Sequence, residues 1–531
     1  MHRFLDSYLE AFNHIYPFLK EDEINDLIEQ KLHQSVPQGK GDIELALLFL
    51  VAALGARNLE RGLDTDLRSD RYLASAMAEI GPLQLYDSLK GVQIMLLLVL
   101  VSLWFPKGLN AWYLMATIIA SCLDLGLQRK RVSKQQGFDA DEEDTRSSIF
   151  WSAYSLERTL STTLGRPLTL RDEAVDIEFP GETGTNYSSY PATVIPSPLQ
   201  DLDFFSVQSF TAPQVASPSE GPPLKKVRIA STNKPDYAAG RFSFRFDRLT
   251  AEIKLMQYRV VQLPSRFPWP TDLGSWQQEA YEACNGLLAT ARRILSSRSL
   301  SHGRSRRALP TIELKYHQCV LLLFRPSPAF RNPTADALAI CHMSALEVLK
   351  IHAEQLKFGE LADTWLTAHL VFISGITVIY TAWVLPGIGN RAAIPGSSNF
   401  TTLDRSVTEA LESGIKACSD LLEHLGQTWS VARDAKEKFD SLGSLTLDAM
   451  RNGTIQFATA LKTHSRPPAA PAIQSDDTTL PSRGELDTSW MNAGDGFVFG
   501  DLLDPPDFLD QLGDFSTSYD FAWMADPSNA L

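Results

Sequence analysis

The five cysteines of this 531-residue chain are scattered singly, and none belongs to a CxxC pair. They stand at Cys122, Cys284, Cys319, Cys341 and Cys418. A zinc ribbon or a disulfide framework needs pairs at short spacing, so neither is expected here. Buried, reduced thiols in a cytosolic or nuclear protein are the expectation instead.

Long hydrophobic runs and an excess of basic charge are also lacking. The longest apolar run, at 91–105, ends before Pro106 and is shorter than the roughly 20 residues of a membrane span. The first residues do not read as a signal peptide, so we expect no membrane association. The formal net charge of −14 disfavours a surface that wraps nucleic acid. Because the HExxH, GxSxG, GxGxxG and phosphate-loop motifs are missing, a helical enzyme is the less favoured function class.

Helical periodicity is what the sequence does contain. Apolar residues keep a spacing of three or four over six turns, at Leu403, Val407, Leu411, Ile415, Cys418, Leu422 and Leu425. Alternating strand patterns are short and scattered. An all-α, multi-helix fold is therefore predicted.

Changes of composition divide the chain into four parts. Residues 1–180 and 241–465 are the two halves of the predicted helical region. Residues 181–240 are rich in Ser, Thr, Pro and Gly, which predicts a mobile, disordered linker. Residues 466–531 form an acidic, aromatic tail, also predicted to be disordered. Twelve acids against Arg483 within 474–531 account for most of the net charge.

The most informative motif is FWSAYSLERTLSTTLGRPLTLRDEAVDIEFP at 150–180. Trp151, Tyr154 and Arg158 follow at close helical spacing. Gly165 can then adopt the left-handed conformation that ends a helix, and Pro167 prevents the helix from continuing. The motif predicts a helix that stops abruptly and is followed by an extended segment.

This motif resembles the middle homology region of fungal binuclear zinc-cluster transcription factors. That family shows an aromatic-rich helix, Leu-Glu-Arg, Ser-x-x-Leu-Gly-Arg-Pro and an acidic stretch before a proline. Residues 111–131, 314–330 and 372–384 resemble three further family segments in the same order, so the resemblance covers about 1–450. The chain departs from the family in having a single Arg146 where a run of arginines is common, and in its long polar gap.

The resemblance implies a helical regulatory region that controls a metabolic or secondary-metabolite gene set, with a small-molecule effector as a candidate ligand. Family members bind DNA through six cysteines that hold two zinc ions, and no such cluster is present here. No cofactor is therefore expected in this chain, and zinc only if an upstream cysteine cluster is missing from the sequence. This chain is itself expected to reach DNA only indirectly. A zinc-cluster partner and a second copy of the chain are its candidate protein partners.

The motif arginines have two open interpretations. Arg158 and Arg166 could contact an effector or partner, or they could pair with Glu157, Asp172 or Asp176 and lock the helix end. We favour the pairing, because a charged side chain at a tight turn is commonly held by a neighbouring opposite charge.

A basic cluster lies in the predicted linker, at Lys225, Lys226 and Arg228. It is a candidate nuclear import signal, although a solvated charge run explains it equally well. Import would place the protein in the nucleus.

The tail alternates acids with large apolar side chains. Its candidate anchors are Phe499, Leu502, Leu503, Phe508, Leu509, Leu512, Phe515, Phe521 and Trp523. Repulsion between acids keeps such a chain expanded, so that apolar groups can enter a coactivator groove. The sequence therefore favours a transcription activator. An adaptor or repressor that binds a zinc-cluster partner is the alternative.

Overall fold

The computed structural model describes residues 1–32, 41–63, 66–81, 83–106, 110–131, 140–182, 236–258, 270, 272–298, 306–385 and 400–451. Within these ranges there are fourteen α-helices and no strand, which confirms the all-α prediction. A short π-helix at Leu9–Asn13 and a 3-10 helix at Asp172–Ala174 complete the described elements. The basic cluster, the tail and most of the predicted linker lie outside the described residues. The division into four parts stays a prediction.

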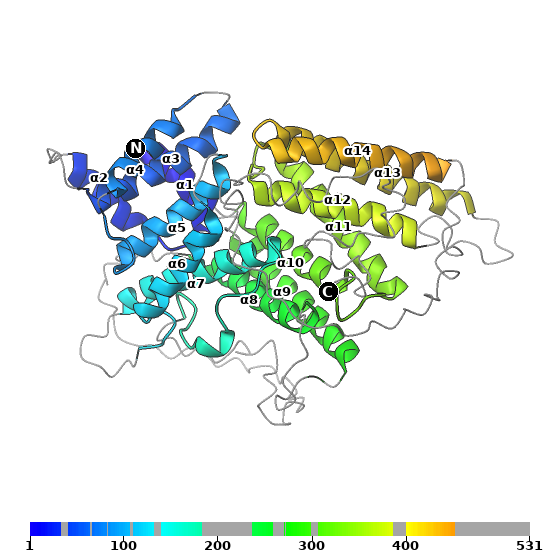
Figure 1. Ribbon diagram of the computed structural model, residues 1–531, viewed down its shortest axis with the longest axis horizontal. Helices are drawn as coiled ribbons and strands as arrows, with labels where there is room; N and C mark the ends of the chain where they lie inside the picture. The colour runs from blue at the N-terminus through cyan, green and yellow to red at the C-terminus, as the bar shows by residue number, and fades with distance from the viewer. Residues whose placement is uncertain are drawn as a thin grey trace, which may run out of the picture.

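Seven helices build an N-terminal lobe around one hydrophobic core (Figure 1). They are α1 (His2–Tyr8), α2 (Glu21–Leu32), α3 (Ile43–Leu63), α4 (Ser69–Ile80), α5 (Leu89–Trp104), α6 (Ala111–Asp124) and α7 (Ala140–Thr163). Helix α5 lies at the centre, and every residue from Gly91 to Trp104 is buried. The side chain of Ser88 caps its first turn by accepting a hydrogen bond from the Gly91 amide at 3.2 Å. The long apolar run is therefore a core helix.

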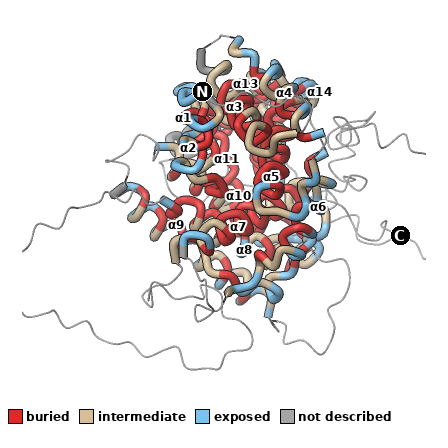
Figure 2. Tube along the Cα trace, turned by 90° about the vertical axis from the view of Figure 1, so that its left-hand side faces the viewer, coloured by how far each residue is buried: buried red, intermediate tan, exposed pale blue. Residues whose placement is uncertain are grey.

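The other seven helices build a C-terminal lobe around a second core. They are α8 (Ala238–Gln257), α9 (Leu273–Arg298), α10 (Ala308–Phe324), α11 (Ala335–Lys357), α12 (Trp365–Val384), α13 (Phe400–Gly426) and α14 (Ser430–Arg451). Helix α8 begins at Ala238, inside the segment predicted as linker. Figure 2 shows the buried residues concentrated along the inner sides of both sets of helices.

Helix α12 is the one helix, among those described, that is long and apolar enough to cross a membrane. However, 72% of its apolar window is buried inside the protein. A close crossing explains part of this burial, because a Cβ added at Gly375 would lie 2.4 Å from the Cys418 Sγ of α13 and 2.7 Å from the Phe439 ring of α14. Glycine is therefore required where these three helices meet.

Two side chains join the lobes, since Tyr16 and Trp365 each pack against both cores. Phe244 of α8 is buried in the N-terminal core, and Ile15 is buried in the C-terminal core. Helices α7 and α8 pack side by side along the same junction. The family-like motif of α7 therefore lies where the two lobes meet.

Candidate functional site

The aromatic residues of α7 hold the extended segment that follows the helix. Trp151 is buried, and its indole Nε1 donates to the Glu178 carbonyl at 3.0 Å. Its ring lies 4.4 Å from that of Phe179 and stacks with Phe244 of α8 at 6.1 Å, centroid to centroid. Trp151 thus fixes the extended segment and α8 on the same side of α7.

Arg158 is at the centre of a buried ion cluster. It is 1% exposed, its Nη1 bonds the carboxylate of Glu157, and its Nη2 donates to Asp172 Oδ1 at 2.9 Å and to the Leu170 carbonyl at 2.6 Å. The guanidinium lies 4.2 Å from the centroid of the Tyr154 ring. Burial alone would lower the pKa of Arg158, but Tyr154, Glu157 and Asp172 raise it above its usual value. The cluster therefore keeps the arginine charged and ties the chain after α7 to the helix.

The remaining oxygens of the cluster are also hydrogen-bonded. Glu157 Oε1 accepts from Ser161 Oγ at 2.9 Å and from the Thr169 amide at 2.8 Å. The Tyr154 hydroxyl donates to Asp172 Oδ1 at 2.9 Å, and burial raises the pKa of this phenol far above its normal value. A buried carboxylate is tolerated only when its charge and lone pairs are satisfied in this way.

The chain turns at Gly165, whose φ of 63° is left-handed. The pairing predicted for both motif arginines is found for Arg158 and not for Arg166. The turn directs the half-buried Arg166 towards α6, where its guanidinium lies 4.9 Å from the centroid of the Trp112 ring. Pro167 follows as an exposed residue. Arg166 is thus part of a surface contact between the motif and α6.

A second buried polar cluster joins the lobes, and no sequence motif indicated it. Asp247 of α8 accepts from Lys315 Nζ of α10 at 2.5 Å and from Ser155 Oγ of α7 at 2.5 Å. Lys315 also donates to Thr159 Oγ1 at 3.1 Å. Burial would lower the pKa of Lys315, but the adjacent Asp247 carboxylate helps to raise it. The charged pair links three helices that are distant in sequence.

The carbonyls at the end of α7 have a partner in the other lobe. Lys254 Nζ of α8 donates to the Ser161 carbonyl at 2.7 Å and to the Arg166 carbonyl at 2.8 Å. A cation at a helix C-terminus satisfies carbonyls that have no partner within the helix. Contacts from both lobes therefore fix the position of the chain at the end of α7.

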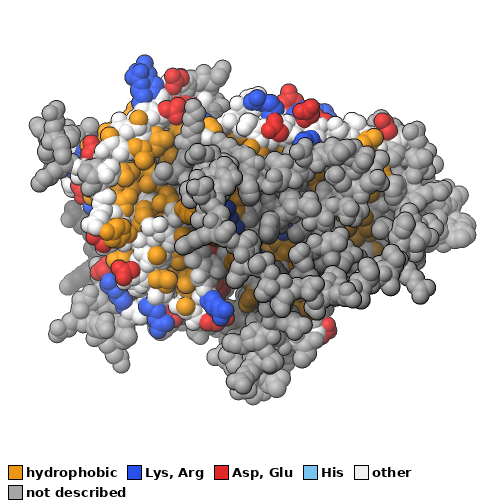
Figure 3. Space-filling view, in the orientation of Figure 1, with side chains coloured by type: hydrophobic (Ala, Val, Ile, Leu, Met, Phe, Trp, Pro, Cys, Tyr) orange, Lys and Arg blue, Asp and Glu red, His pale blue; other side chains and the backbone are white. Residues whose placement is uncertain are grey.

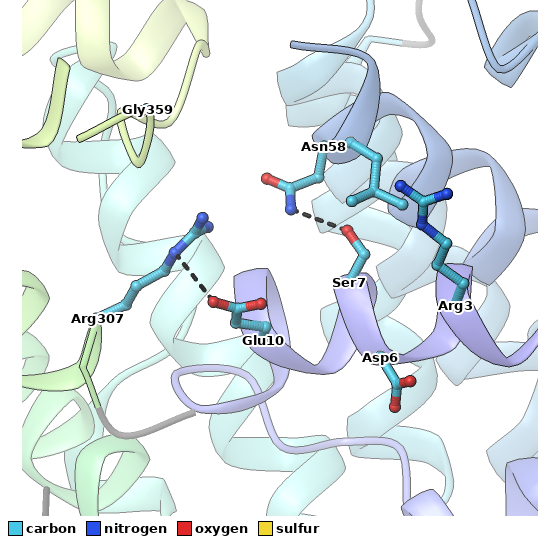
Figure 4. Close-up of a pocket in the computed structure, with 8 residues that line it drawn as sticks. Arg3, Asp6, Ser7, Glu10, Asn58, Arg307 and Gly359 are labelled. Atoms are coloured by element: carbon cyan, nitrogen blue, oxygen red, sulfur yellow. Dashed lines mark hydrogen bonds and ion pairs between the residues drawn. The ribbon is translucent and has the colours of Figure 1, made fainter. Parts of the chain in front are cut away.

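A polar cavity of about 320 Å³ opens between the lobes (Figure 4). It is lined by Arg3, Asp6, Ser7, Glu10, Asn58, Leu59, Arg307 and Gly359. The Asn58 amide donates to Ser7 Oγ at 2.9 Å, and the Arg307 guanidinium lies 3.8 Å from the Glu10 carboxylate. Cationic and anionic side chains both line this cavity. A polar molecule fits such a lining better than an apolar one.

The cysteines do not form a site that fits zinc. All five are buried and free, and they lie on five different helices, α6, α9, α10, α11 and α13. Within the described part of the chain, no group of three or more His, Cys, Asp or Glu residues is placed to hold a metal ion.

These features define an all-helical domain whose signature motif contains a buried ion cluster around Arg158. The same motif contacts the second lobe through Ser155, which bonds Asp247 of α8. The sequence model of the fungal specific transcription factor domain matches residues 5–210. This match over residues 5–210 confirms the resemblance drawn from the motif.

Several fungal regulators are similar to the chain. Pyrimidine pathway regulatory protein 1 of Saccharomyces cerevisiae is 23% identical over 59% of this chain and 30% of its own length. Protein STB5 of the same yeast is 22% identical over 84% of this chain and 54% of its own length. The positive regulator of purine utilization of Emericella nidulans is 22% identical over 64% of this chain and 35% of its own length. The chain thus spans about a third to a half of these relatives, and no solved structure matches it.

Proposed function

We propose that this protein regulates transcription in the nucleus, as an activator of a metabolic or secondary-metabolite gene set. The observation that carries the proposal is the match of residues 5–210 to the fungal specific transcription factor domain. Two of the similar proteins are named for pyrimidine and purine metabolism. No catalytic role is proposed, because the family and these relatives are transcription regulators.

The acidic tail is the proposed activating segment, and coactivators are its proposed partners. Large apolar side chains supply most of the affinity of small interfaces, whereas exposed charges mainly speed the encounter. We therefore assign the binding energy to the apolar anchors and the steering to the twelve acids.

The activator proposal is tested by fusing the full chain to an unrelated DNA-binding domain and measuring a reporter. The wild-type fusion should activate. Replacing Phe508, Leu509, Leu512 and Phe515 by Ala should abolish activation, whereas Asp501→Asn with Asp510→Asn should reduce it only partly. The opposite ranking would contradict the assigned roles. A nuclear, expressed, inactive wild-type fusion would favour the adaptor or repressor.

DNA contact is proposed to be indirect, through a zinc-cluster partner. A second copy of the chain is the other candidate protein partner. Without partners, the purified chain should bind duplex DNA weakly and without sequence preference, and salt should weaken binding further. A sequence-selective footprint from this chain alone would overturn that proposal.

A small-molecule effector is also proposed, with the polar cavity as its candidate site. The facing charges of Arg307 and Glu10 favour a ligand that carries both an anionic and a cationic group.

A further inference from the structure

Helix α6 leaves an apolar face uncovered. One side packs against α5 and α7, and the other exposes Tyr113, Ala116, Thr117, Ala120 and Leu123. Tyr113 is 55% exposed and Leu123 is 39% exposed. Figure 2 shows α6 at the edge of the molecule, and hydrophobic side chains gather over the N-terminal lobe in Figure 3. An exposed apolar face of this kind is a candidate interaction surface.

This face is uncharged along its length and carries one charge at each end. No charged residue occurs from Ala111 to Leu123. Arg166 lies over Trp112 at the N-terminal end, and Asp124 is exposed at the C-terminal end. Neither side chain makes an ion pair with another described residue. The two charges have opposite sign and are about 18 Å apart along the helix, at 1.5 Å per residue.

Large and small exposed side chains are spaced symmetrically along the face. Tyr113 and Leu123 lie five positions on either side of Ile118, and Ala116 and Ala120 lie two positions on either side. If a second α6 ran antiparallel to the first, Tyr113 of one copy would meet Leu123 of the other. Arg166 would likewise meet Asp124. Ala116 and Ala120 would let the helix axes approach to about 8 Å.

We propose that the α6 face is a homodimer interface, in which two copies of this chain pack antiparallel about a two-fold axis near Ile118. A two-fold interface must be self-complementary, so that each contact occurs twice. An apolar centre flanked by opposite charges meets this requirement. The proposal does not depend on the transcriptional role.

The test is the solution mass of the full chain, measured by analytical ultracentrifugation over a concentration series. The wild type should approach twice the 58.9 kDa chain mass. Ala120→Arg, at the centre of the face, should shift the chain to the monomer. Met343→Arg is the matched control, because Met343 is 58% exposed on α11 of the other lobe, and it should leave the mass unchanged.

Charge exchange gives the sharper result. Asp124→Arg and Arg166→Asp should each weaken the dimer at least tenfold, and the double exchange should restore most of the affinity, because both ion pairs are rebuilt with reversed sign. Asp124 is exposed, so its variant tests the interface even if Ala120→Arg lowers the melting temperature. A wild-type chain that stays monomeric, or a dimer that all these variants leave unchanged, would overturn the proposal.

Discussion

Replacing Arg158 by Met should strongly destabilise the protein. The substitution keeps most of the side-chain volume but removes the charge that lies between Glu157 and Asp172. Glu157 is 1% exposed, so its carboxylate would be left buried without a cation. Asp172 has a side chain that is 29% exposed and can turn to water, so it adds little to the loss.

The magnitude follows from the burial of the Arg158–Glu157 pair. Removing one partner of a buried ion pair costs about 3–5 kcal/mol, since the remaining charge keeps its desolvation penalty. Arg248→Met is the matched control. Arg248 lies 3.6 Å from the same Asp172, but its side chain is 45% exposed. Exposed pairs contribute about 0–1 kcal/mol, so the control should lose far less stability.

The assay is urea denaturation followed by tryptophan fluorescence at several pH values. An unpaired buried carboxylate binds a proton more readily in the folded than in the unfolded state, so lowering the pH should reduce the deficit of Arg158→Met relative to the wild type. Adding Glu157→Gln should recover part of the loss at neutral pH. The Gln carbonyl oxygen can still accept from Ser161 Oγ and the Thr169 amide.

The reasoning would be refuted by equal losses below about 1 kcal/mol for Arg158→Met and Arg248→Met. It would also be refuted if the deficit of Arg158→Met did not change with pH. Either result would mean that water screens the Arg158–Glu157 pair.

Three further predictions concern other parts of the chain. Gly375→Ala forces a Cβ to 2.4 Å from the Cys418 Sγ and should lower the free energy of unfolding by about 1–3 kcal/mol. Gly286→Ala, in the open middle of α9, should instead raise it by about 0.5–1 kcal/mol. Equal melting temperatures for the two variants would contradict this. Burial lowers the pKa of His352 from 6.5 to about 4. Between these pH values the unfolded state binds a proton that the folded state does not, so stability should fall as the pH drops from about 6.5 to 4. Calorimetry of His352→Gln should show a weaker dependence of stability on pH. Changing the basic cluster to Ala should reduce nuclear accumulation of a tagged chain, and an undiminished nuclear signal would leave it an ordinary charge run.

The sequence predicted features that depend on neighbours along the chain. Periodic apolar residues predicted the helices, because a helix buries one face at a spacing of three or four. Gly165 and Pro167 predicted the stop after α7, because both act through the local backbone. The resemblance of the α7 motif likewise came from a continuous segment. The apolar sequence around each cysteine predicted that its side chain is buried, and all five are.

The tertiary structure decided the contacts between residues far apart in sequence. Asp247 and Lys315 pair across 68 residues, and Arg166 lies on Trp112 rather than beside a carboxylate. Periodicity shows which face of a helix is buried, but several neighbours can cover that face. The outer face of α6 shows the same limit, since its apolar composition predicts burial although its own chain leaves Tyr113 and Leu123 exposed. The spatial arrangement of the helices, which no local pattern encodes, determines which charges meet and which apolar faces remain open.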